Sequence, residues 1–300
     1  MKVLATRQLP GPAWGDLEDV EVGVIDEPRA DVEALIVAND TIDDAVLELF
    51  PALRLVASFS VGYDRIDVQA CRVRGVAVTN TPGVLDAATA DLAFALILAT
   101  RRRLVEGDAL VRTGRWSTDW SASPLLGRDV TGATLGIVGL GRIGSAVAHR
   151  ARAFEMRVLY HQRTRAECAE VEYRELDDLL AESDIVSLHT PLNPATVGLI
   201  SRERLSRLCD GATLVNTSRG AVVDEPALVD ELVSGRIRAG LDVFVHEPHV
   251  PEVLRGLPNV VLTPHIASAT SETRAAMARI VVDNILAAER GEPLPTPVRE

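Results

Sequence analysis

Hydrophobic and polar positions along this chain alternate between two patterns. Short runs rich in β-branched residues are separated by stretches in which apolar positions recur at helical spacing. Strands that alternate with helices in this way are typical of βαβ units, which build parallel sheets. The pattern therefore predicts an α/β fold, and it continues from one end of the chain to the other.

Two series of these units follow one another. In the first, strands are expected at residues 2–6, 34–38, 53–58 and 76–79, with helices near residues 42–50 and 64–73. A helix over residues 87–103 then leads away into a polar stretch. In the second, strands are expected at residues 134–138, 158–160, 184–189, 212–216, 240–244 and 260–262. A final helix over residues 271–290 could return to pack on the first sheet.

Composition and charge narrow the class of protein. With 300 residues and 47% hydrophobic residues, the chain is long enough for about two domains with sizeable cores. A net charge of -12 disfavours nucleic acid as a partner. The longest apolar run, residues 92–99, is far shorter than the ~20 residues of a membrane span, and the first residues open no signal peptide. We therefore expect a cytoplasmic protein that binds no membrane.

Two residue types exclude particular chemistries. The three cysteines, Cys71, Cys168 and Cys209, are dispersed and form no C-x-x-C pair, so they predict neither a disulfide framework nor a zinc site. Lys2 is the only lysine in the chain. Its position excludes a Schiff-base lysine or a phosphate-loop lysine in the rest of the sequence.

A glycine-rich loop follows the first strand of the second series. It reads Gly139-Leu-Gly141-Arg142-Ile143-Gly144 and opens a helical pattern. Gly139 permits a tight turn, Gly141 lets a pyrophosphate approach the backbone, and Gly144 lets the helix pack close to the strand. The amides at the helix N-terminus then face the anion. The loop predicts a dinucleotide site, with a purely structural glycine turn as the alternative.

The residues after the next strand indicate which dinucleotide is preferred. Folds that prefer NAD place Asp or Glu ~20 residues beyond the glycine loop, where it accepts from the ribose 2′-hydroxyl. Here the sequence reads His161-Gln-Arg163-Thr164-Arg165, with no acid before position 167. Two guanidiniums and a hydroxyl favour a 2′-phosphate, so we expect NADP(H) to be preferred and NAD(H) to be usable. Arg163 is the first choice of contact; a solvated basic loop is the alternative.

Three later strands end beside residues of complementary chemistry. Arg219 follows one strand, Glu247 the next and His265 the last. Open α/β sheets bind ligands at the carboxyl ends of their strands. Arg219 would hold a substrate carboxylate and carbonyl oxygen, and His265 would donate a proton to that oxygen. Glu247 would orient the imidazole and raise its pKa. Together they predict a reductase of 2-oxoacids that uses a nicotinamide hydride.

Further short motifs extend this pattern over almost the whole chain. They are Ser60-Val61-Gly62-Tyr-Asp, Thr81-Pro-Gly-Val-Leu85, His189-Thr190-Pro191-Leu192, Asn216 to Gly220, Asp242 to Pro248 and Pro264-His265-Ile266. With these motifs and the glycine loop, the chain resembles the D-isomer-specific 2-hydroxyacid dehydrogenase family. The resemblance implies two doubly wound parallel-sheet lobes with the active site between them. A Rossmann cofactor domain, residues 98–271, would be inserted in a flavodoxin-like substrate domain, residues 1–97 and 272–300.

The resemblance also implies roles for individual residues and a homodimer built on the cofactor lobe. Arg219, Glu247 and His265 are the catalytic residues that it implies. The backbone amides of Val61 and Gly62 would form a second contact to the substrate carboxylate. The cofactor contacts that it adds are Asp242, near the nicotinamide carboxamide, and Thr190 and Pro191, beside the dinucleotide.

Within the family the chain is most similar to glyoxylate/hydroxypyruvate reductases. The similarity includes the Thr81 to Leu85 motif, the Arg163 loop, Trp116 and Trp120. The expected function is NADPH-preferring reduction of small 2-oxoacids to D-2-hydroxyacids. Trp120 is a candidate for shaping the pocket of a partner subunit.

Other functions compete with this interpretation. Another D-2-hydroxyacid dehydrogenase, such as a phosphoglycerate dehydrogenase, is one alternative, and a cofactor-sensing binding protein without activity is another. The complete set of Arg219, Glu247 and His265 counts against a sensor. A metal site at His246, Glu247 and His249 is not expected, because the intervening proline opposes the helix that an H-E-x-x-H motif needs.

Overall fold

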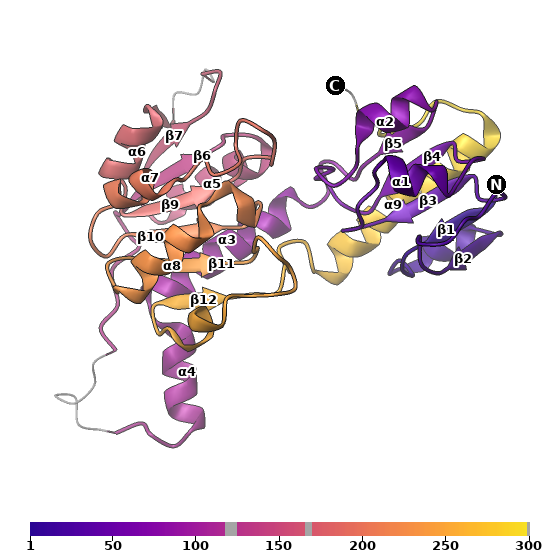
Figure 1. The fold of residues 1–300 in the computed structure, drawn as a ribbon. Coiled ribbons are helices and arrows are strands. Elements are labelled where there is room, and N and C mark those ends of the chain that lie inside the picture. The colour runs from indigo at the N-terminus through magenta and orange to yellow at the C-terminus, as the bar shows by residue number, and fades with distance from the viewer. Residues whose placement is uncertain (118–124, 166–169, 299–300) are drawn as a thin grey trace. The chain divides into compact units, whose positions relative to one another are not determined.

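The computed structural model describes residues 1–117, 125–165 and 170–298 (Figure 1). The predictions for Trp120 and Cys168 lie outside these residues. The chain divides into two compact units. Unit 1 is Met1–Leu85 with Ser268–Glu300, and unit 2 is Asp86–Ala267. Each unit is a parallel sheet flanked by helices, so the predicted pair of doubly wound α/β lobes is confirmed.

Unit 1 contains a five-stranded parallel sheet in the order β2-β1-β3-β4-β5, which is the flavodoxin-like order. Its strands are β1 (Val3–Ala5), β2 (Val20–Val22), β3 (Ala34–Val37), β4 (Leu55–Ser58) and β5 (Ala77–Thr79). Its helices are η1 (Pro12–Asp16), α1 (Asp44–Glu48), α2 (Val68–Val73) and α9 (Ser271–Arg290). Helix α9 packs on β4 and η1. The expectation that the last helix returns to the first sheet is confirmed.

Alternate side chains of the unit 1 sheet fill cores on both faces. Leu35 and Val37 of β3 pack with Phe50 and Cys71 on the face covered by α1 and α2. The Cys71 side chain is buried, and burial raises the pKa of its thiol to about 11. A thiol in such surroundings packs as a small apolar side chain.

Unit 2 contains a seven-stranded parallel sheet in the order β12-β11-β10-β9-β6-β7-β8. From β8 to β11 this is the doubly wound order of dinucleotide-binding domains, with the topological switch between β6 and β9. The strands are β6 (Thr134–Val138), β7 (Arg157–His161), β8 (Glu172–Tyr173), β9 (Ile185–Leu188), β10 (Thr213–Asn216), β11 (Arg238–Leu241) and β12 (Val260–Leu262). The helices are α3 (Asp86–Arg101), α4 (Leu104–Arg112), α5 (Arg142–Ala153), α6 (Leu176–Glu182), α7 (Arg202–Arg207), α8 (Glu225–Val233), η3 (Gly220–Val222) and η4 (Glu252–Gly256).

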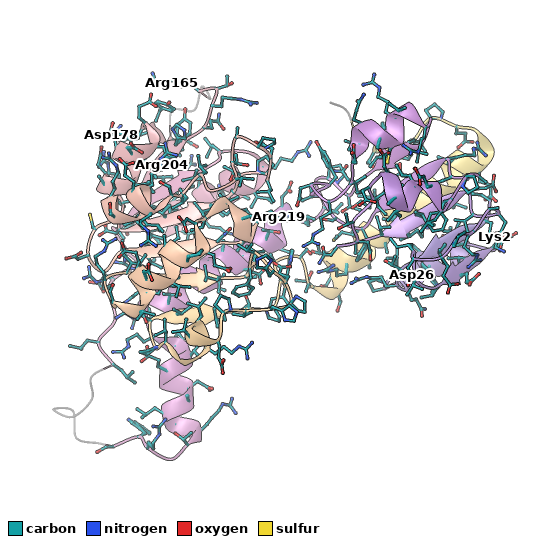
Figure 2. All side chains as sticks on the ribbon, in the orientation of Figure 1. Lys2, Asp26, Arg165, Asp178, Arg204 and Arg219 are labelled. Atoms are coloured by element: carbon teal, nitrogen blue, oxygen red, sulfur yellow. The ribbon has the colours of Figure 1, made fainter. Side chains whose placement is uncertain are left out.

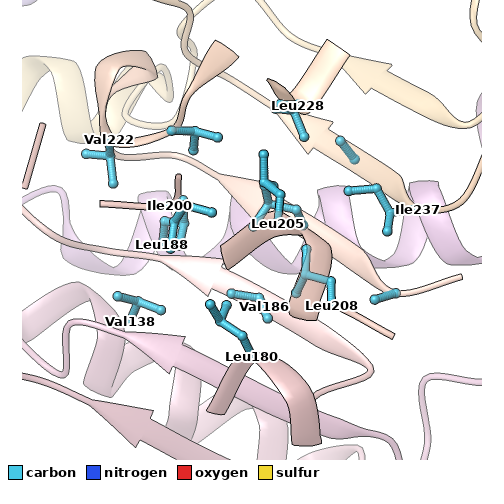
Figure 3. Packing of buried hydrophobic residues seen from close by; sticks show 14 of the residues in the cluster. Val138, Leu180, Val186, Leu188, Ile200, Leu205, Leu208, Val222, Leu228 and Ile237 are labelled. Atoms are coloured by element: carbon cyan, nitrogen blue, oxygen red, sulfur yellow. The ribbon is translucent and has the colours of Figure 1, made fainter. Parts of the chain in front are cut away.

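The unit 2 sheet has an aliphatic core on each face. Figure 3 shows Val186 and Leu188 of β9 on one face, together with Leu180 of α6, Leu205 of α7 and Leu228 of α8. The opposite face packs against α3 and α5. Strands buried on both faces carry continuous apolar runs, and this is why the sequence pattern located them.

The structure differs from the expected pattern in several places, among them the unit boundaries and the end of one strand. Helix α3 belongs entirely to unit 2, because it packs on α5, β10 and β11. The chain therefore passes from one compact unit to the other at residues 85/86 and 267/268, whereas the domain bounds expected from the sequence are 97/98 and 271/272. Strand β11 ends at Leu241 rather than at residue 244. Val243 and Phe244 remain buried in the following loop, so their apolarity extended the strand pattern too far.

No helix within residues 1–117, 125–165 and 170–298 combines the length and apolarity that a membrane crossing requires. The cytoplasmic location expected from the sequence stays a prediction.

Candidate active site

The candidate catalytic and cofactor residues lie along the carboxyl edge of the unit 2 sheet. All strand pairs in this sheet are parallel, so every strand ends at the same edge. In sheet order, His265 follows β12, Glu247 follows β11, Arg219 follows β10 and Thr190 follows β9. The glycine loop follows β6, and Arg163 follows β7 beyond it. Residues from six separate segments are thus brought to one edge.

The glycine loop has the geometry that a pyrophosphate site needs. Gly139 has a φ of +98°, and a Cβ there would lie 2.7 Å from the His189 carbonyl oxygen. A Cβ on Gly144 would lie 2.1 Å from the Gly139 carbonyl oxygen, so only glycine lets α5 start this close to β6. A Cβ on Gly141 would meet no atom within 4 Å. The open space at Gly141 is where an anion can approach the first amides of α5.

Two buried hydroxyl groups at the same sheet edge also fit a bound dinucleotide. The Oγ1 atoms of Thr190 and Thr217 are buried and have no hydrogen-bond partner in the described part of the chain. They follow β9 and β10, next to the topological switch. Buried polar atoms in folded proteins are normally paired, so a ligand at this edge is the expected partner. Pro191, beside Thr190, is exposed at the same strand end.

The Arg163 loop begins next to the glycine loop. Val138 of β6 pairs with His161 of β7, and the Gly139 amide donates to the His161 carbonyl at 2.8 Å. Arg163 and Thr164 are exposed beyond this pair. Arg165, labelled in Figure 2, places its guanidinium carbon 4.0 Å from the centre of the Tyr173 ring, a cation–π contact. Arg165 thus has a partner on the protein, whereas Arg163 extends into solvent.

His265 and Glu247 form a hydrogen-bonded pair. The His265 Nδ1 atom lies 2.8 Å from Glu247 Oε2, and the Phe244 amide donates to Glu247 Oε1 at 3.0 Å. Burial opposes ionisation of Glu247, but the hydrogen bonds from His265 and Phe244 and the charge of Arg219 outweigh it and lower the pKa. Glu247 is therefore a carboxylate at neutral pH. It fixes the imidazole by Nδ1 and leaves Nε2 for a substrate.

A fully buried aspartate holds the loop that carries His265. Asp242 Oδ1 accepts from the Thr263 hydroxyl at 2.6 Å and the Ile266 amide at 2.8 Å, and Oδ2 accepts from the Ala267 amide at 2.9 Å. His265 itself has a φ of +53°, which is uncommon for a residue with a side chain. Burial raises the pKa of Asp242 despite these hydrogen bonds. Its expected contact to a nicotinamide carboxamide stays a prediction.

The Arg219 loop is fixed by Asn216 and Gly220. Asn216 Oδ1 accepts from the Ser218 amide at 3.0 Å, and Asn216 Nδ2 donates to the Arg219 carbonyl at 2.9 Å. A Cβ on Gly220 would lie 2.1 Å from the Phe244 carbonyl carbon. Glycine at this position therefore lets the Arg219 loop touch the loop that carries Glu247. This contact places Arg219, labelled in Figure 2, close enough to act on the Glu247 charge.

Sequence reasoning assigned no role to several supporting residues. Glu225 Oε1 accepts from the Val245 amide at 3.1 Å and so anchors the Glu247 loop to α8. The turn at Asn216 could have been recognised, because Asn often accepts from the backbone two residues further on. The contacts of Gly220, Glu225 and Thr263 join distant segments, so no local signal identifies them.

The two substrate-binding candidates of unit 1 follow β4. Val61 and Gly62 are half-buried, and the Val61 carbonyl accepts from Asn80 Nδ2 at 2.8 Å. Their contact to a substrate carboxylate stays a prediction. In the ranges covered by the structure, no three His, Cys, Asp or Glu side chains are grouped as ligands for a metal ion.

One edge of a doubly wound sheet thus carries a glycine loop, an arginine and a Glu–His pair, which together are the features of an NAD(P)-dependent oxidoreductase. A family model for the NAD binding domain of D-isomer specific 2-hydroxyacid dehydrogenases matches residues 94–267. The chain belongs to the D-isomer specific 2-hydroxyacid dehydrogenase family.

Similar proteins agree with this assignment over the whole chain. A glyoxylate reductase of Korarchaeum cryptofilum is 51% identical, over 100% of this chain and 96% of the relative. The crystal structure of the TT0316 protein from Thermus thermophilus has a TM-score of 0.93 and 48% identity, with 100% of both chains covered. An NADPH-dependent glyoxylate/hydroxypyruvate reductase of Sinorhizobium meliloti, solved with NADP and malonate, has a TM-score of 0.91 and 37% identity over 99% of this chain and 96% of that one. The family predicted from the sequence is confirmed.

Proposed function

We propose that this protein prefers NADPH and reduces small 2-oxoacids: glyoxylate to the achiral glycolate, and hydroxypyruvate and its relatives to D-2-hydroxyacids. The observation that carries the proposal is the 2.8 Å pair of His265 and Glu247, which follows strands on the same sheet edge as Arg219 and the glycine loop. The similar glyoxylate reductase of Korarchaeum cryptofilum supports the choice of substrate. Unit 2 would serve as the cofactor domain and unit 1 as the substrate domain.

Each polar residue of the site has a defined task in this reaction. When bound, the reduced nicotinamide supplies a hydride to the carbonyl carbon of the oxoacid. His265 donates the Nε2 proton to the carbonyl oxygen, so a hydroxyl forms and the ring becomes neutral. Glu247 keeps the ring oriented for this transfer through its contact to Nδ1. Arg219 binds the substrate carboxylate with two N–H groups, and the amides of Val61 and Gly62 donate to the same carboxylate.

Initial rates with a set of 2-oxoacids test the proposed function. NADPH oxidation is measured with glyoxylate, hydroxypyruvate, pyruvate and longer 2-oxoacids, and each series is repeated with NADH. We expect the highest kcat/KM with glyoxylate or hydroxypyruvate and NADPH. Saturable NADPH binding without turnover of any 2-oxoacid would instead identify a cofactor-sensing protein. A clear preference for 3-phosphoglycerate oxidation would point to the phosphoglycerate dehydrogenases.

The preference for NADPH is assigned to Arg163, with Thr164 and Arg165 supporting it. The cofactor backbone is proposed to contact the loop from Gly139 to Gly144, including Arg142 and Ile143, as well as Thr190, Pro191 and Asp242.

The variant Arg163→Asp tests the cofactor preference. It should lower the ratio of kcat/KM for NADPH to that for NADH by about tenfold or more, because a charge-assisted bond becomes a repulsion. Arg102→Asp, at an exposed arginine after α3, is the matched control. An unchanged ratio in Arg163→Asp would remove this residue from cofactor selection.

We also propose that the protein forms a homodimer through unit 2. In Figure 1, α4 projects from the sheet of its unit, and none of its residues is buried. Leu104, Val105 and Val111 are each more than half exposed on this helix. A second copy of the same helix would cover these side chains, as in other symmetric dimers. Light scattering should give a dimer for the wild type and a monomer for Leu104→Glu/Val111→Glu; a monomeric wild type would contradict the proposal.

A further inference from the structure

Unit 1 contains a cavity of about 640 Å³ at the carboxyl edge of its own sheet. Its walls include Thr6 after β1, Gly23 after β2 and Asp40 after β3. In the order β2-β1-β3-β4-β5, the gap between β1 and β3 is the topological switch point. Open α/β sheets bind ligands at this point, and the cavity volume lies within the range of about 300–1,000 Å³ typical of small-molecule sites.

The cavity exists because one connection of the sheet lacks a helix. Residues 23–33, which join β2 to β3, contain no helix. This segment therefore leaves Val24 68% exposed at the cavity rim. The facing wall is helix α1 and the residue after it, with Ala45, Val46 and Leu49 turned toward the cavity. The result is a hollow whose two main walls are apolar.

The charged groups that line the cavity are acidic. Asp26 and Asp40 line it, and none of its lining residues is Lys, Arg or His. Asp40 Oδ2 accepts from the Thr6 hydroxyl at 2.7 Å and the Ala38 amide at 3.0 Å, which fixes this carboxylate. Within the described residues, Asp40 Oδ1 receives no hydrogen bond, and Asp26 (labelled in Figure 2) has neither a hydrogen bond nor an ion pair.

This combination of charge and shape selects one class of ligand. Two carboxylates in a lining without basic residues repel anions, so this cavity disfavours 2-oxoacids and dinucleotide phosphates. The free carboxylate oxygens are suited to accept from an ammonium group, because hydrogen bonds between two charged groups are the stronger ones. The walls formed by Val24, Val46 and Leu49 are suited to a hydrocarbon body.

We propose that the cavity of unit 1 binds a small organic cation with an apolar body and a primary ammonium group. The ammonium group donates to Asp40 Oδ1 and to Asp26, and the hydrocarbon part lies between the loop after β2 and helix α1. This site uses none of the residues assigned to the reductase reaction. It is therefore an additional binding function, independent of the turnover of 2-oxoacids.

Calorimetric titration with two probes of equal chain length tests the proposal. Hexylammonium chloride carries the charge, and 1-hexanol lacks it. We expect hexylammonium to bind the wild type with a Kd about tenfold lower than that of 1-hexanol, which is the effect of one charge-assisted hydrogen bond. Asp26→Asn and Asp40→Asn should each reduce this difference. Glu27→Gln, at an exposed neighbour outside the cavity lining, is the matched control and should keep it.

A variant with a bulky side chain tests whether the probes bind in this cavity. Ala45 is exposed on α1 and faces the cavity, so Ala45→Trp should place a large ring in the cavity without disturbing the core and should abolish the binding of both probes. Equal affinities for the two probes, or hexylammonium binding that survives both Ala45→Trp and Asp26→Asn, would overturn the proposal. NADPH oxidation with glyoxylate is measured on the same variants. Calorimetry measures probe binding, and NADPH oxidation measures the reductase activity. A failed binding proposal and a failed reductase proposal therefore give different results.

Discussion

Units 1 and 2 are parallel sheets of similar architecture, but their carboxyl edges carry opposite kinds of chemistry. The edge of unit 2 combines the positive charge of Arg219, the negative charge of Glu247 and the imidazole of His265. At the edge of unit 1, the cavity near Asp26 and Asp40 offers carboxylates and apolar walls without a basic residue. Because both sheets have their switch point at this edge, the loops after the strands decide the chemistry and the scaffold does not.

The two edges also differ in how firmly their loops are held. In unit 2, the loops after β10, β11 and β12 contact one another through Asn216, Gly220 and Asp242, all of which are buried. In unit 1, the loop after β2 is largely exposed. A proton donor must be placed accurately relative to its substrate, and buried hydrogen bonds supply that accuracy. We infer that the firmly held edge is built for reaction and the looser one for binding.

Removal of the proposed proton donor should have the largest effect on catalysis. His265→Ala should lower kcat for glyoxylate by about 10²–10⁴, because general acid catalysis is lost while the dinucleotide site remains. Steady-state rates and NADPH binding by fluorescence measure the two quantities separately. Asp40→Asn at the unit 1 edge should leave kcat unchanged.

His249→Ala is the matched control for this variant, because His249 is exposed in the Glu247 loop. A rate close to that of the wild type in His265→Ala would remove this histidine from the mechanism. A comparable loss in Asp40→Asn would mean that the chemistry does not belong to the unit 2 edge alone.

Replacement of the Arg219 guanidinium by an ammonium group should have a smaller effect on catalysis than the loss of His265. Arg219→Lys keeps the charge but cannot donate two parallel hydrogen bonds to a carboxylate. We expect kcat/KM for glyoxylate to fall by about 10- to 100-fold, as for the loss of one hydrogen bond to a charged group. Arg207→Lys on the exposed surface of α7 is the control. Unaltered kinetics in Arg219→Lys would place the carboxylate contact elsewhere.

Strongly apolar segments with clear ends were predictable from the sequence. Strands β6 and β12 and helix α9 begin and end at the expected residues, because apolar runs bounded by polar residues are local signals. The glycine loop was also predictable, since three glycines at fixed spacing report backbone geometry directly. The pattern missed the strands β2 and β8 and the helix α4, in which no side chain is fully buried, so their burial signal is weak.

The contacts that shape the candidate site were beyond local patterns. Asp242 has a motif position but no local feature that reveals its three hydrogen bonds to the loop after β12. Gly220 is explained only by the approach of Phe244 from another strand end. The cavity of unit 1 depends on a helix that is missing between β2 and β3, and a sequence pattern shows the elements present rather than the space left between them.

Two glycines of the same loop should respond differently to an added methyl group. Gly144→Ala should lower the free energy of unfolding by about 1–3 kcal/mol, because the methyl group meets the Gly139 carbonyl at 2.1 Å. Gly141→Ala should affect stability less and weaken NADPH binding, since its methyl group occupies the open approach to α5. Gly15→Ala in unit 1, also in open space, is the control. Urea unfolding and NADPH titration measure both effects; equal stability losses in Gly144→Ala and Gly141→Ala would contradict the packing argument.

The smallest expected effect is on the pH dependence of stability. It comes from two carboxylates whose pKa values shift in opposite directions. The pKa of Glu247 lies below its ordinary 4.5, so its stabilisation is fully present above that pH and is lost as the pH falls through the native pKa. The pKa of Asp242 lies above its ordinary 3.8, so its contribution declines as the pH rises from that value through the native pKa.

Urea unfolding monitored by circular dichroism, from about pH 6 to pH 3, should separate these contributions. The excess free energy of unfolding of the wild type over Glu247→Gln should shrink on acidification, because protonation removes the charge that His265 and Arg219 stabilise. Over the same range, the free energy of unfolding of the wild type should rise relative to that of Asp242→Asn, because the buried carboxyl is more easily accommodated without its charge. If both differences moved in the same direction, the contrast between a paired carboxylate and a buried one at this edge would be wrong.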